Sequence, residues 1–428
     1  MKKIINGKTH IGEHKLHPES LMMSYGYDSN LSEGSVKPPV FLTSTFCYPM
    51  AEDGEEFFHV ASGRKPLPDG ESAGLIYSRF NHPNVEIVED RLALLEGSDE
   101  AVVCASGMGA ISSTMLSALR PGDVLIHGSP LYGGTEVLIR NIISQFGIQL
   151  VEFHDGLNEC EINSAVEKAK ALGPVAMIFV ETPGNPTNAL VDFELINKAA
   201  DKLLADTGLR PVTVVDNTLQ GPIFQQAVPH GIDLAVYSLT KYVGGHSDLI
   251  AGAVCGNGEV INKVRVIRNS MGINLDPHTC WMILRSMETL NIRMKRAADS
   301  GSKVAHWLAE NAPVPVKVLH PELITNPVYQ TTYRKQCSGP GSTFSLVLNA
   351  DRKTAFRFIN ALSLFKSAVS LGGTESLVSH PASTTHSGVP EEVRVSTGIE
   401  EGLIRVSIGM EHPEDLIADL KNAFKSIL

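Results

Sequence analysis

The sequence predicts an α/β protein with a large domain built on a mainly parallel sheet and a smaller α+β domain after it. Two observations lead to this prediction. Short apolar runs rich in Val and Ile recur between residues 101 and 238, and amphipathic segments of helical length separate most of them. Strands that alternate with helices are typical of a parallel sheet covered on both faces. A single run could be a buried helix, but the repeated alternation favours strands.

Six apolar runs are the expected strands of the large sheet. They are residues 101–106, 124–128, 149–154 and 175–182, a run that ends at Asp216, and residues 234–238. Segments 108–119 and 135–147 have the apolar spacing of helices. A further helix begins near residue 85, and Gly97 is its expected end.

The remaining chain divides into an N-terminal arm and a C-terminal domain. Residues 1–80 contain a Gly/Pro-rich stretch at 62–74, so this segment cannot easily build a core of its own. A long helical pattern at 278–310 precedes mixed signals. These are strands at 316–320, 343–349 and 402–409, and helices near 352–362 and at 413–428. We therefore expect an arm at 1–80, a large domain at 81–285 and a small domain at 286–428.

Composition excludes several classes of protein. The chain has 428 residues, of which 43% are hydrophobic and 19% charged, which is typical of a globular protein. Its formal net charge of -11, without a Lys/Arg run, argues against binding to nucleic acid.

Cysteine spacing and the apolar runs bear on metal binding and location. The six cysteines form no CxxC pair, so no zinc site is expected, and unpaired cysteines fit a reducing, cytoplasmic location. The N-terminus lacks the apolar stretch of a secretory signal, and no run of 18 apolar residues predicts a membrane span.

The segments after the expected strands contain the residues suited to chemistry. Ligands of an open parallel sheet bind beyond the carboxyl ends of its strands. Ser106, Gly107 and Met108 open a helix directly after a strand, where free N–H groups and the helix dipole favour a phosphate. This signal alone is weak, because an ordinary serine N-cap explains it equally well.

The segment 238–248, SLTKYVGGHSD, is more specific. Lys241 stands among Ser238, Thr240 and glycines at a strand end, so it can present its amine to a carbonyl while the hydroxyls bind a phosphate. Asp216 ends an apolar strand, where an unpaired carboxylate would be costly and a cationic partner is expected. A lysine Schiff base with an acidic partner for a pyridine nitrogen is the signature of pyridoxal 5'-phosphate (PLP).

With these motifs, the chain resembles the Cys/Met-metabolism family of PLP-dependent enzymes. The resemblance runs from residues 36–46 to residues 402–411. The family includes cystathionine γ-synthase, the cystathionine lyases, methionine γ-lyase and the homoserine sulfhydrylases. It implies the aspartate-aminotransferase-like fold, which is called fold type I. It also implies that Lys241 carries PLP and then moves protons, while Asp216 keeps the ring nitrogen protonated.

The resemblance assigns further roles in cofactor binding. Tyr132 stacks on the ring and transfers a proton to the leaving group, and Asn185 lies near the 3'-oxygen with Glu181 behind it. The residues expected at the phosphate are Gly107, Met108, Ser238 and Thr240. Tyr77 and Arg79 reach the phosphate of the neighbouring subunit, which implies an arm that contacts that subunit and a homotetramer built from catalytic dimers.

Substrate recognition is expected at Arg405, which would form a bidentate pair with the α-carboxylate, helped by Ser370 and Asn185. Val369 stands where members that act on cystathionine often carry an acidic residue, so it favours a methionine-like or acylated homoserine chain. Leu371 replaces the tryptophan of a bacterial β-lyase type.

Gly134 departs from methionine γ-lyases of the best-known type, which have a cysteine there. The stretch 54–74 could line the partner's substrate entrance. The leading hypothesis is γ-elimination or γ-replacement on a sulfur amino acid or an O-acylhomoserine, as in methionine γ-lyase or cystathionine γ-synthase. The alternatives are an O-acylhomoserine sulfhydrylase and a cystathionine γ- or β-lyase. A PLP-binding protein without activity is disfavoured because Lys241, Tyr132, Asp216 and Arg405 are all present.

Overall fold

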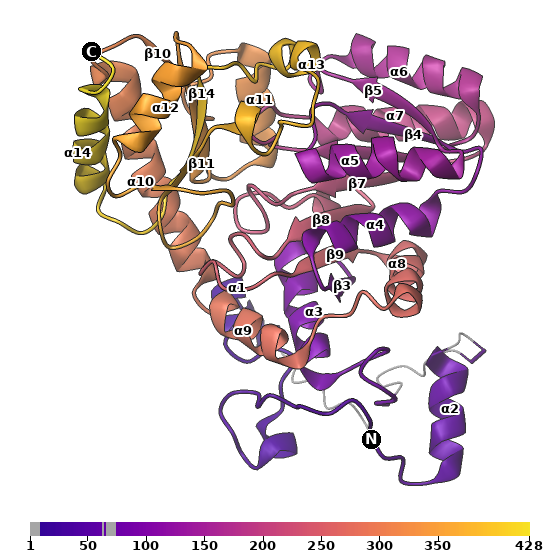
Figure 1. The fold of residues 1–428 in the computed structure, drawn as a ribbon. Coiled ribbons are helices and arrows are strands. Elements are labelled where there is room, and N and C mark those ends of the chain that lie inside the picture. Colours follow the sequence, from indigo (N-terminus) through magenta and orange to yellow (C-terminus); the bar gives the residue numbers. More distant parts are fainter. Residues whose placement is uncertain (1–8, 62–63, 66–73) are drawn as a thin grey trace.

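The computed structural model describes residues 9–61, 64–65 and 74–428. Figure 1 shows three parts, which are an N-terminal segment, a large α/β body, and a smaller body that ends with the C-terminus. Part of the stretch 54–74 lies outside the described residues, so its expected role at a substrate entrance stays a prediction.

Seven strands form the large sheet among the described residues, in the order β3-β9-β8-β7-β6-β4-β5. They are β3 (Glu100–Cys104), β4 (Val124–Gly128), β5 (Gln149–Phe153), β6 (Val175–Glu181), β7 (Val212–Asp216), β8 (Leu234–Ser238) and β9 (Gly252–Gly256). The pairs from β8 to β5 are parallel, whereas β9 runs antiparallel to both β3 and β8. The six predicted strands and the mainly parallel sheet are confirmed, but β9 was missed.

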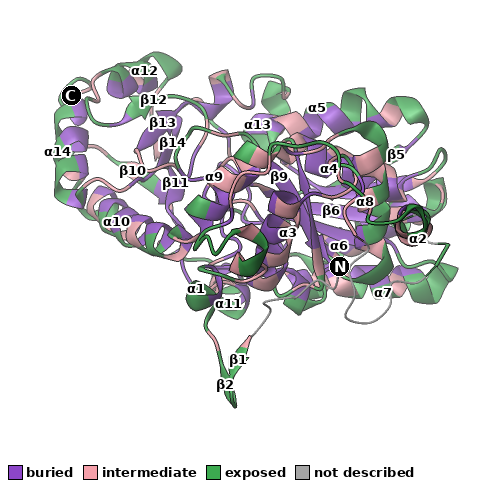
Figure 2. Cartoon of the chain, turned by 90° about the horizontal axis from the view of Figure 1, so that it is seen from below, coloured by how far each residue is buried: buried purple, intermediate pink, exposed green. Residues whose placement is uncertain are grey.

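Helices cover both faces of this sheet because its side chains alternate between two apolar cores. One face packs against α3 (Pro83–Glu96), α6 (Glu159–Leu172), α7 (Phe193–Thr207) and α9 (Pro277–Met287). The other packs against α4 (Gly107–Ala118), α5 (Gly133–Asn141) and α8 (Gly258–Met271). Figure 2 shows the strands as mostly buried between exposed outer helix faces. As predicted, α3 ends before Gly97, whose φ of 74° forms its left-handed cap.

The smaller body is an α+β domain, as predicted. Its five-stranded sheet has the order β10-β11-β14-β13-β12. The strands are β10 (Val316–Leu319), β11 (Thr343–Leu348), β12 (Lys366–Ser367), β13 (Leu377–Ser379) and β14 (Leu403–Ser407). Its helices are α10 (Leu290–Asn311), α11 (Pro327–Gln336), α12 (Arg352–Asn360), α13 (Glu391–Ser396) and α14 (Pro413–Phe424). The helical pattern predicted at 278–310 is two helices, α9 and α10, rather than one.

The N-terminal segment contains short elements and one longer helix. A hairpin of β1 (His10–Ile11) and β2 (His14–Lys15) projects from the body and is exposed (Figure 2). It is followed by α1 (Pro18–Leu21) and α2 (Ala51–Ala61). The sequence did not predict α2, because Gly54 disfavours a helix and a Gly/Pro-rich stretch follows this segment. The helix is nevertheless continuous through Gly54. The expected contact of residues 1–80 with a neighbouring subunit stays a prediction.

The parallel register gathers the expected functional residues at one edge of the sheet. Glu181 of β6 lies opposite Asp216 of β7. The antiparallel β9 begins at this edge, where Gly252 lies opposite both Cys104 and Ser238. A Cβ atom on Gly252 would lie 2.2 Å from the Ser106 carbonyl oxygen, so glycine is required for the turn after β3 to approach β9.

The close contact between Gly252 and the turn after β3 can be tested by substitution. We expect Gly252→Ala to lower the free energy of unfolding by about 1–3 kcal/mol, because the added methyl group must displace backbone atoms of the neighbouring turn. Urea denaturation of purified protein measures the change. Gly388→Ala is the matched control, because a Cβ atom there meets nothing within 4 Å and its φ is not positive. Equal stability of the two variants would contradict the prediction.

Candidate active site

The turn from β3 into α4 offers an anion site. Ser106 is the N-cap of α4, and its hydroxyl accepts the Gly109 N–H at 2.9 Å. The N–H groups of Gly107 and Met108 donate no hydrogen bond to other described residues. A Cβ atom on Gly107 would lie 3.0 Å from the Ser238 Cβ, so this turn contacts the end of β8. The free N–H groups and the helix dipole suit a phosphate.

Lys241 lies beside two residues of the small domain. Its Nζ donates to the Ser370 hydroxyl at 2.9 Å, while the Ser370 carbonyl accepts Arg405 Nη2 at 2.6 Å. Burial, and to a smaller extent the nearby charge of Arg405, lower the pKa of Lys241 to about 8. Ser370 has a φ of 86°, an uncommon conformation for a residue with a side chain. The structure thus brings three of the predicted site residues together, while their roles stay predictions.

Arg405 is a buried cation that has no acidic partner among the described residues. Its side chain is 3% exposed, and Nη1 donates to the Asn185 side-chain oxygen at 3.1 Å. Its two acceptors, Asn185 Oδ1 and Ser370 O, are neutral, and it forms no ion pair with any residue that the structure describes. Burial lowers the pKa of Arg405 to about 10, so the guanidinium remains charged near neutral pH. A carboxylate would stabilise it strongly.

Glu181 and Asp216 place two carboxyl groups at adjacent strand ends. Glu181 accepts the backbone N–H groups of Tyr132 at 2.6 Å and Asn185 at 2.8 Å. Burial and the charge of Asp216 raise the pKa of Glu181 to about 8. Burial also raises the pKa of Asp216, although the Thr218 hydroxyl and N–H donate to its Oδ1 at 2.6 and 3.1 Å. Its Oδ2 accepts no hydrogen bond from the described residues.

Tyr132 is the N-cap residue of α5, next to the strand-end residues described above. Its ring is 41% exposed, and its position depends on the glycine two residues later. A Cβ atom on Gly134 would lie 2.6 Å from the Tyr132 ring and 3.1 Å from the Met108 sulfur. Gly134 therefore lets the tyrosine ring lie against the start of α4.

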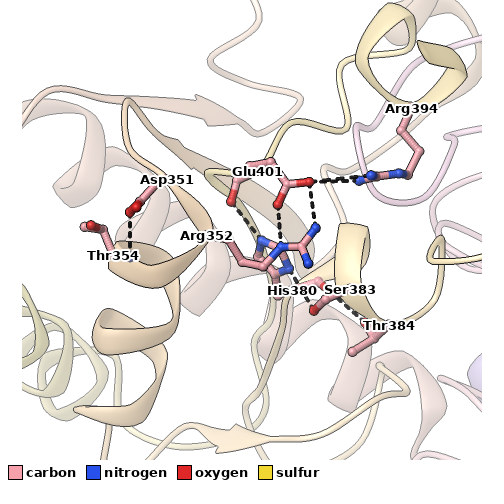
Figure 3. Close-up of polar contacts among 8 residues, drawn as sticks. All are labelled: Asp351, Arg352, Thr354, His380, Ser383, Thr384, Arg394 and Glu401. Atoms are coloured by element: carbon pink, nitrogen blue, oxygen red, sulfur yellow. Dashed lines mark hydrogen bonds and ion pairs between the residues drawn. The ribbon is translucent and has the colours of Figure 1, made fainter. Parts of the chain in front are cut away.

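Salt bridges and a hydrogen bond to Glu401 anchor the segment that carries Thr385 and passes close to α5. Figure 3 shows Glu401 between two arginines, with Arg352 bound at 2.6 and 2.9 Å and Arg394 of α13 at 3.4 Å. The Glu401 carbonyl also accepts His380 Nε2 at 2.8 Å. Between these anchors, the Thr385 carbonyl approaches α5 so closely that only glycine fits at position 133.

Other predicted residues are less directly connected to Lys241. The Thr240 hydroxyl bonds to the backbone of Ala251, donating to its oxygen at 3.2 Å and accepting its N–H at 3.1 Å. Tyr77 is 42% exposed, and Arg79 donates to the Asn269 carbonyl at 3.0 Å. Among the described residues, no hydrogen bond or ion pair joins Tyr77 or Arg79 to this site, so their role at a neighbouring subunit's phosphate stays a prediction. Val369 is 58% exposed beside Ser370.

The sequence missed His386, a buried residue near this cluster. Burial lowers its pKa to about 4, and the charges of Arg405 and Arg394 act in the same direction, so its ring is neutral. Its Nδ1 lies 2.9 Å from the Thr385 hydroxyl. No local motif marks a histidine that folding brings to a distant arginine.

These residues fit PLP, the cofactor that the sequence implies. Asp216 Oδ2 is a carboxylate oxygen without a hydrogen-bond donor, which a protonated ring nitrogen would supply. The free N–H groups of Gly107 and Met108 suit the phosphate, and Lys241 offers an amine of lowered pKa. In the part of the chain that the structure describes, no group of three metal-ligating side chains gathers, and no helix is both long and apolar enough to span a membrane.

Comparison with known proteins identifies the family. Residues 19–425 match the family described as Cys/Met metabolism PLP-dependent enzyme. L-methionine gamma-lyase of Pseudomonas putida is 38% identical over 405 residues, which cover 94% of this chain and 96% of that protein. Cystathionine gamma-synthase of Escherichia coli (strain K12) is 35% identical over 408 residues, with coverage of 94% and 96%.

A solved structure agrees with both the fold and the family. Cystathionine gamma-synthase from Xanthomonas oryzae pv. oryzae, in complex with cystathionine, superposes with a TM-score of 0.85 at 30% identity. The match covers 96% of this chain and 98% of that one. The fold-type-I prediction is thereby confirmed. This chain belongs to the Cys/Met metabolism family of PLP-dependent enzymes, and pyridoxal 5'-phosphate is its cofactor.

Proposed function

We propose that this enzyme performs γ-elimination or γ-replacement on a methionine-like amino acid or an O-acylhomoserine. The observation that carries the proposal is the unpaired, buried charge of Arg405 above Lys241. Because its two acceptors are neutral and it is only 3% exposed, its best partner is the α-carboxylate of an amino-acid substrate. Asn185 and the Ser370 backbone orient the guanidinium for this contact.

The chain's own residues then divide the chemical tasks. PLP supplies an aldehyde that joins to amines and a ring that accepts electrons when a proton leaves the substrate. Asp216 holds a proton at the ring nitrogen through Oδ2. Lys241 moves protons at the substrate's Cα and Cβ, and Tyr132 transfers a proton to the departing γ-group. These roles are general acid–base steps by groups on neighbouring strand ends and turns at one edge of the large sheet.

The lowered pKa of Lys241 prepares the amine for both attachment and proton transfer. With a pKa of about 8, about one molecule in ten carries the neutral amine at pH 7, against fewer than one in a thousand for an ordinary lysine. Only the neutral amine attacks an aldehyde or accepts a proton. Burial and Arg405 thus increase the reactive form at neutral pH.

One position supports a methionine-like or acylated substrate over cystathionine, and a second bears on the choice between methionine and an O-acylhomoserine. Val369 adjoins Ser370 and offers no charge to a distal ammonium group. Gly134 gives Tyr132 room beside Met108, and this position departs from the cysteine of well-known methionine γ-lyases. The second difference favours replacement chemistry on an O-acylhomoserine as the alternative to methionine cleavage.

A substrate panel tests the proposed function. We expect turnover of methionine, O-acetylhomoserine or O-succinylhomoserine with loss of the γ-substituent, and product analysis with and without added cysteine or sulfide separates elimination from replacement. The amine analogue of methionine that lacks the carboxylate should react at least about a hundredfold more slowly, because Arg405 would have no partner. Preferred β-cleavage of cystathionine would contradict the proposal.

The pH dependence of cofactor attachment tests the role of Lys241. We expect the attachment rate of PLP to the apoenzyme to rise about tenfold per pH unit below pH 8 and to level off above it, because deprotonation of the amine precedes attack. Stopped-flow absorbance measures this rate. Free N-acetyl-lysine is the control, and its rate should continue to rise toward pH 10. An identical pH profile for the two amines would refute the lowered pKa.

Val369 provides a test of specificity. Val369→Glu should raise the ratio of kcat/KM for cystathionine over methionine by about tenfold, because a carboxylate beside Ser370 can pair with the distal ammonium group. Val369→Gln controls for size and polarity. If the glutamine variant shifts the ratio equally, charge is not the determinant.

A further inference from the structure

A buried polar cluster lies behind the acidic strand ends, on the opposite side of the sheet from the active site. We call Glu96, Asn217, Gln225 and Tyr237 the rear network. The side chains of Asp216 and Ser238 point to the face of the sheet that α4 covers, because side chains alternate along β7 and β8. Asn217 and Tyr237 therefore point to the face covered by α3, and Tyr237 belongs to that apolar core.

Asn217 directly follows Asp216, and its side chain is held on every side. Its Nδ2 donates to the Tyr237 hydroxyl at 2.7 Å and to the Gln225 carbonyl at 2.9 Å. Its Oδ1 accepts Gln225 Nε2 at 2.8 Å. Asn217 is fully buried, so these bonds fix the residue that directly follows Asp216 in the chain.

Tyr237 connects Asn217 to a buried carboxylate. Its hydroxyl accepts from Asn217, so its own proton is donated to Glu96 Oε2. Glu96 Oε1 accepts the N–H groups of Ala227 at 2.6 Å and Val228 at 3.0 Å. Glu96 is fully buried at the end of α3, and three donors compensate its desolvation. The tyrosine is therefore anchored at a rigid point in the core.

Gln225 extends the same network to the neighbouring strand. Its Nε2 also donates at 2.7 Å to the carbonyl of Thr182, which directly follows Glu181. Thr182 N–H in turn donates to the Asp216 carbonyl at 3.3 Å. The rear network thus holds the ends of both β6 and β7, where Glu181 and Asp216 lie opposite each other.

Gly221 shows how closely this network is packed. A Cβ atom there would lie 2.4 Å from Asn217 Nδ2 and 2.6 Å from the Tyr237 hydroxyl. Any side chain at this position would separate Asn217 from Tyr237 without removing a hydrogen-bonding group.

We propose that Tyr237, anchored on Glu96, is a positioning residue that holds Asn217 and thereby aims the Asp216 carboxylate at the ring nitrogen of PLP. The inference rests on the proposed binding of the cofactor at Asp216. It assigns Tyr237 no contact with the cofactor or the substrate.

The test compares the purified holoenzyme with Tyr237→Phe, which loses only the hydroxyl. A proton on the ring nitrogen disfavours a second positive charge on the nitrogen that joins Lys241 to PLP. If Asp216 is held less well, the pH midpoint of the visible absorbance change should move upward by about half a unit or more. PLP should bind the apoenzyme about tenfold more weakly. Spectrophotometric titration measures both quantities.

Tyr27→Phe is the matched control. Tyr27 is 7% exposed and its hydroxyl donates to the Ser35 carbonyl at 2.9 Å, so the variant loses one phenol bond of the same apolar core away from the strand ends. Its pH midpoint and PLP affinity should match those of the wild type. If Tyr237→Phe does not fold, Gly221→Ala provides the second variant, and the same upward shift is expected of it.

The outcomes distinguish this inference from the proposed function. An unchanged pH midpoint in the folded Tyr237 or Gly221 variant would overturn the positioning role. Equal shifts in the Tyr27 control would overturn it as well, since they would report a general loss of packing. A wild-type protein that binds no PLP would instead refute the cofactor site itself.

Discussion

The uncompensated charge of Arg405 is the constraint on which the site depends. A buried guanidinium without an acidic partner is costly, and here Asn185 Oδ1 and the Ser370 carbonyl are the neutral acceptors that hold it. The same charge lowers the pKa of Lys241, which it repels across Ser370. A substrate carboxylate would neutralise the guanidinium and so remove part of the force that keeps Lys241 unprotonated. Binding of a carboxylate at Arg405 and the protonation of the Lys241 amine would therefore be coupled electrostatically.

The contacts of Arg405 also explain why the two domains must pack as they do. Asn185 belongs to the large domain, whereas Arg405 and Ser370 belong to the small one. Asn188, three residues after Asn185, donates to the carbonyls of Leu319 and Thr343 at 2.9 and 3.0 Å, which ties its loop to the small sheet. Because one short loop serves both the site and the domain contact, movement of the small domain would also move Arg405 relative to Asn185.

The sequence predicts much of this arrangement because strand ends in a parallel sheet converge, and Asp216 and Lys241 stand directly after apolar runs. It fails where the deciding contact is distant in sequence. β9 reads as a continuation of a glycine-rich loop, yet its Gly252 is needed for contact with the turn after β3. Helix α2 was missed because glycine at position 54 disfavours a helix. The structure requires glycine there for packing, since a Cβ atom would lie 2.8 Å from the Tyr48 ring. Glu96 and Tyr237 are 141 residues apart, so no local pattern could indicate their bond.

Because Glu181 and Asp216 are paired carboxyl groups, the position of Asp216 affects the ionisation of both. Burial raises the pKa of both groups, and the charge of Asp216 contributes to the value of about 8 for Glu181. A cation near Asp216 Oδ2, such as the protonated ring nitrogen proposed there, favours the charged form of Asp216 and thereby acts against ionisation of Glu181. A small displacement of Asp216 would weaken that interaction, and the pKa of Glu181, which holds the backbone of Tyr132, depends on the same charge. On our proposal, the rear network fixes both strand ends together and so preserves the spacing of the two carboxyl groups as well as the direction of the Asp216 carboxylate.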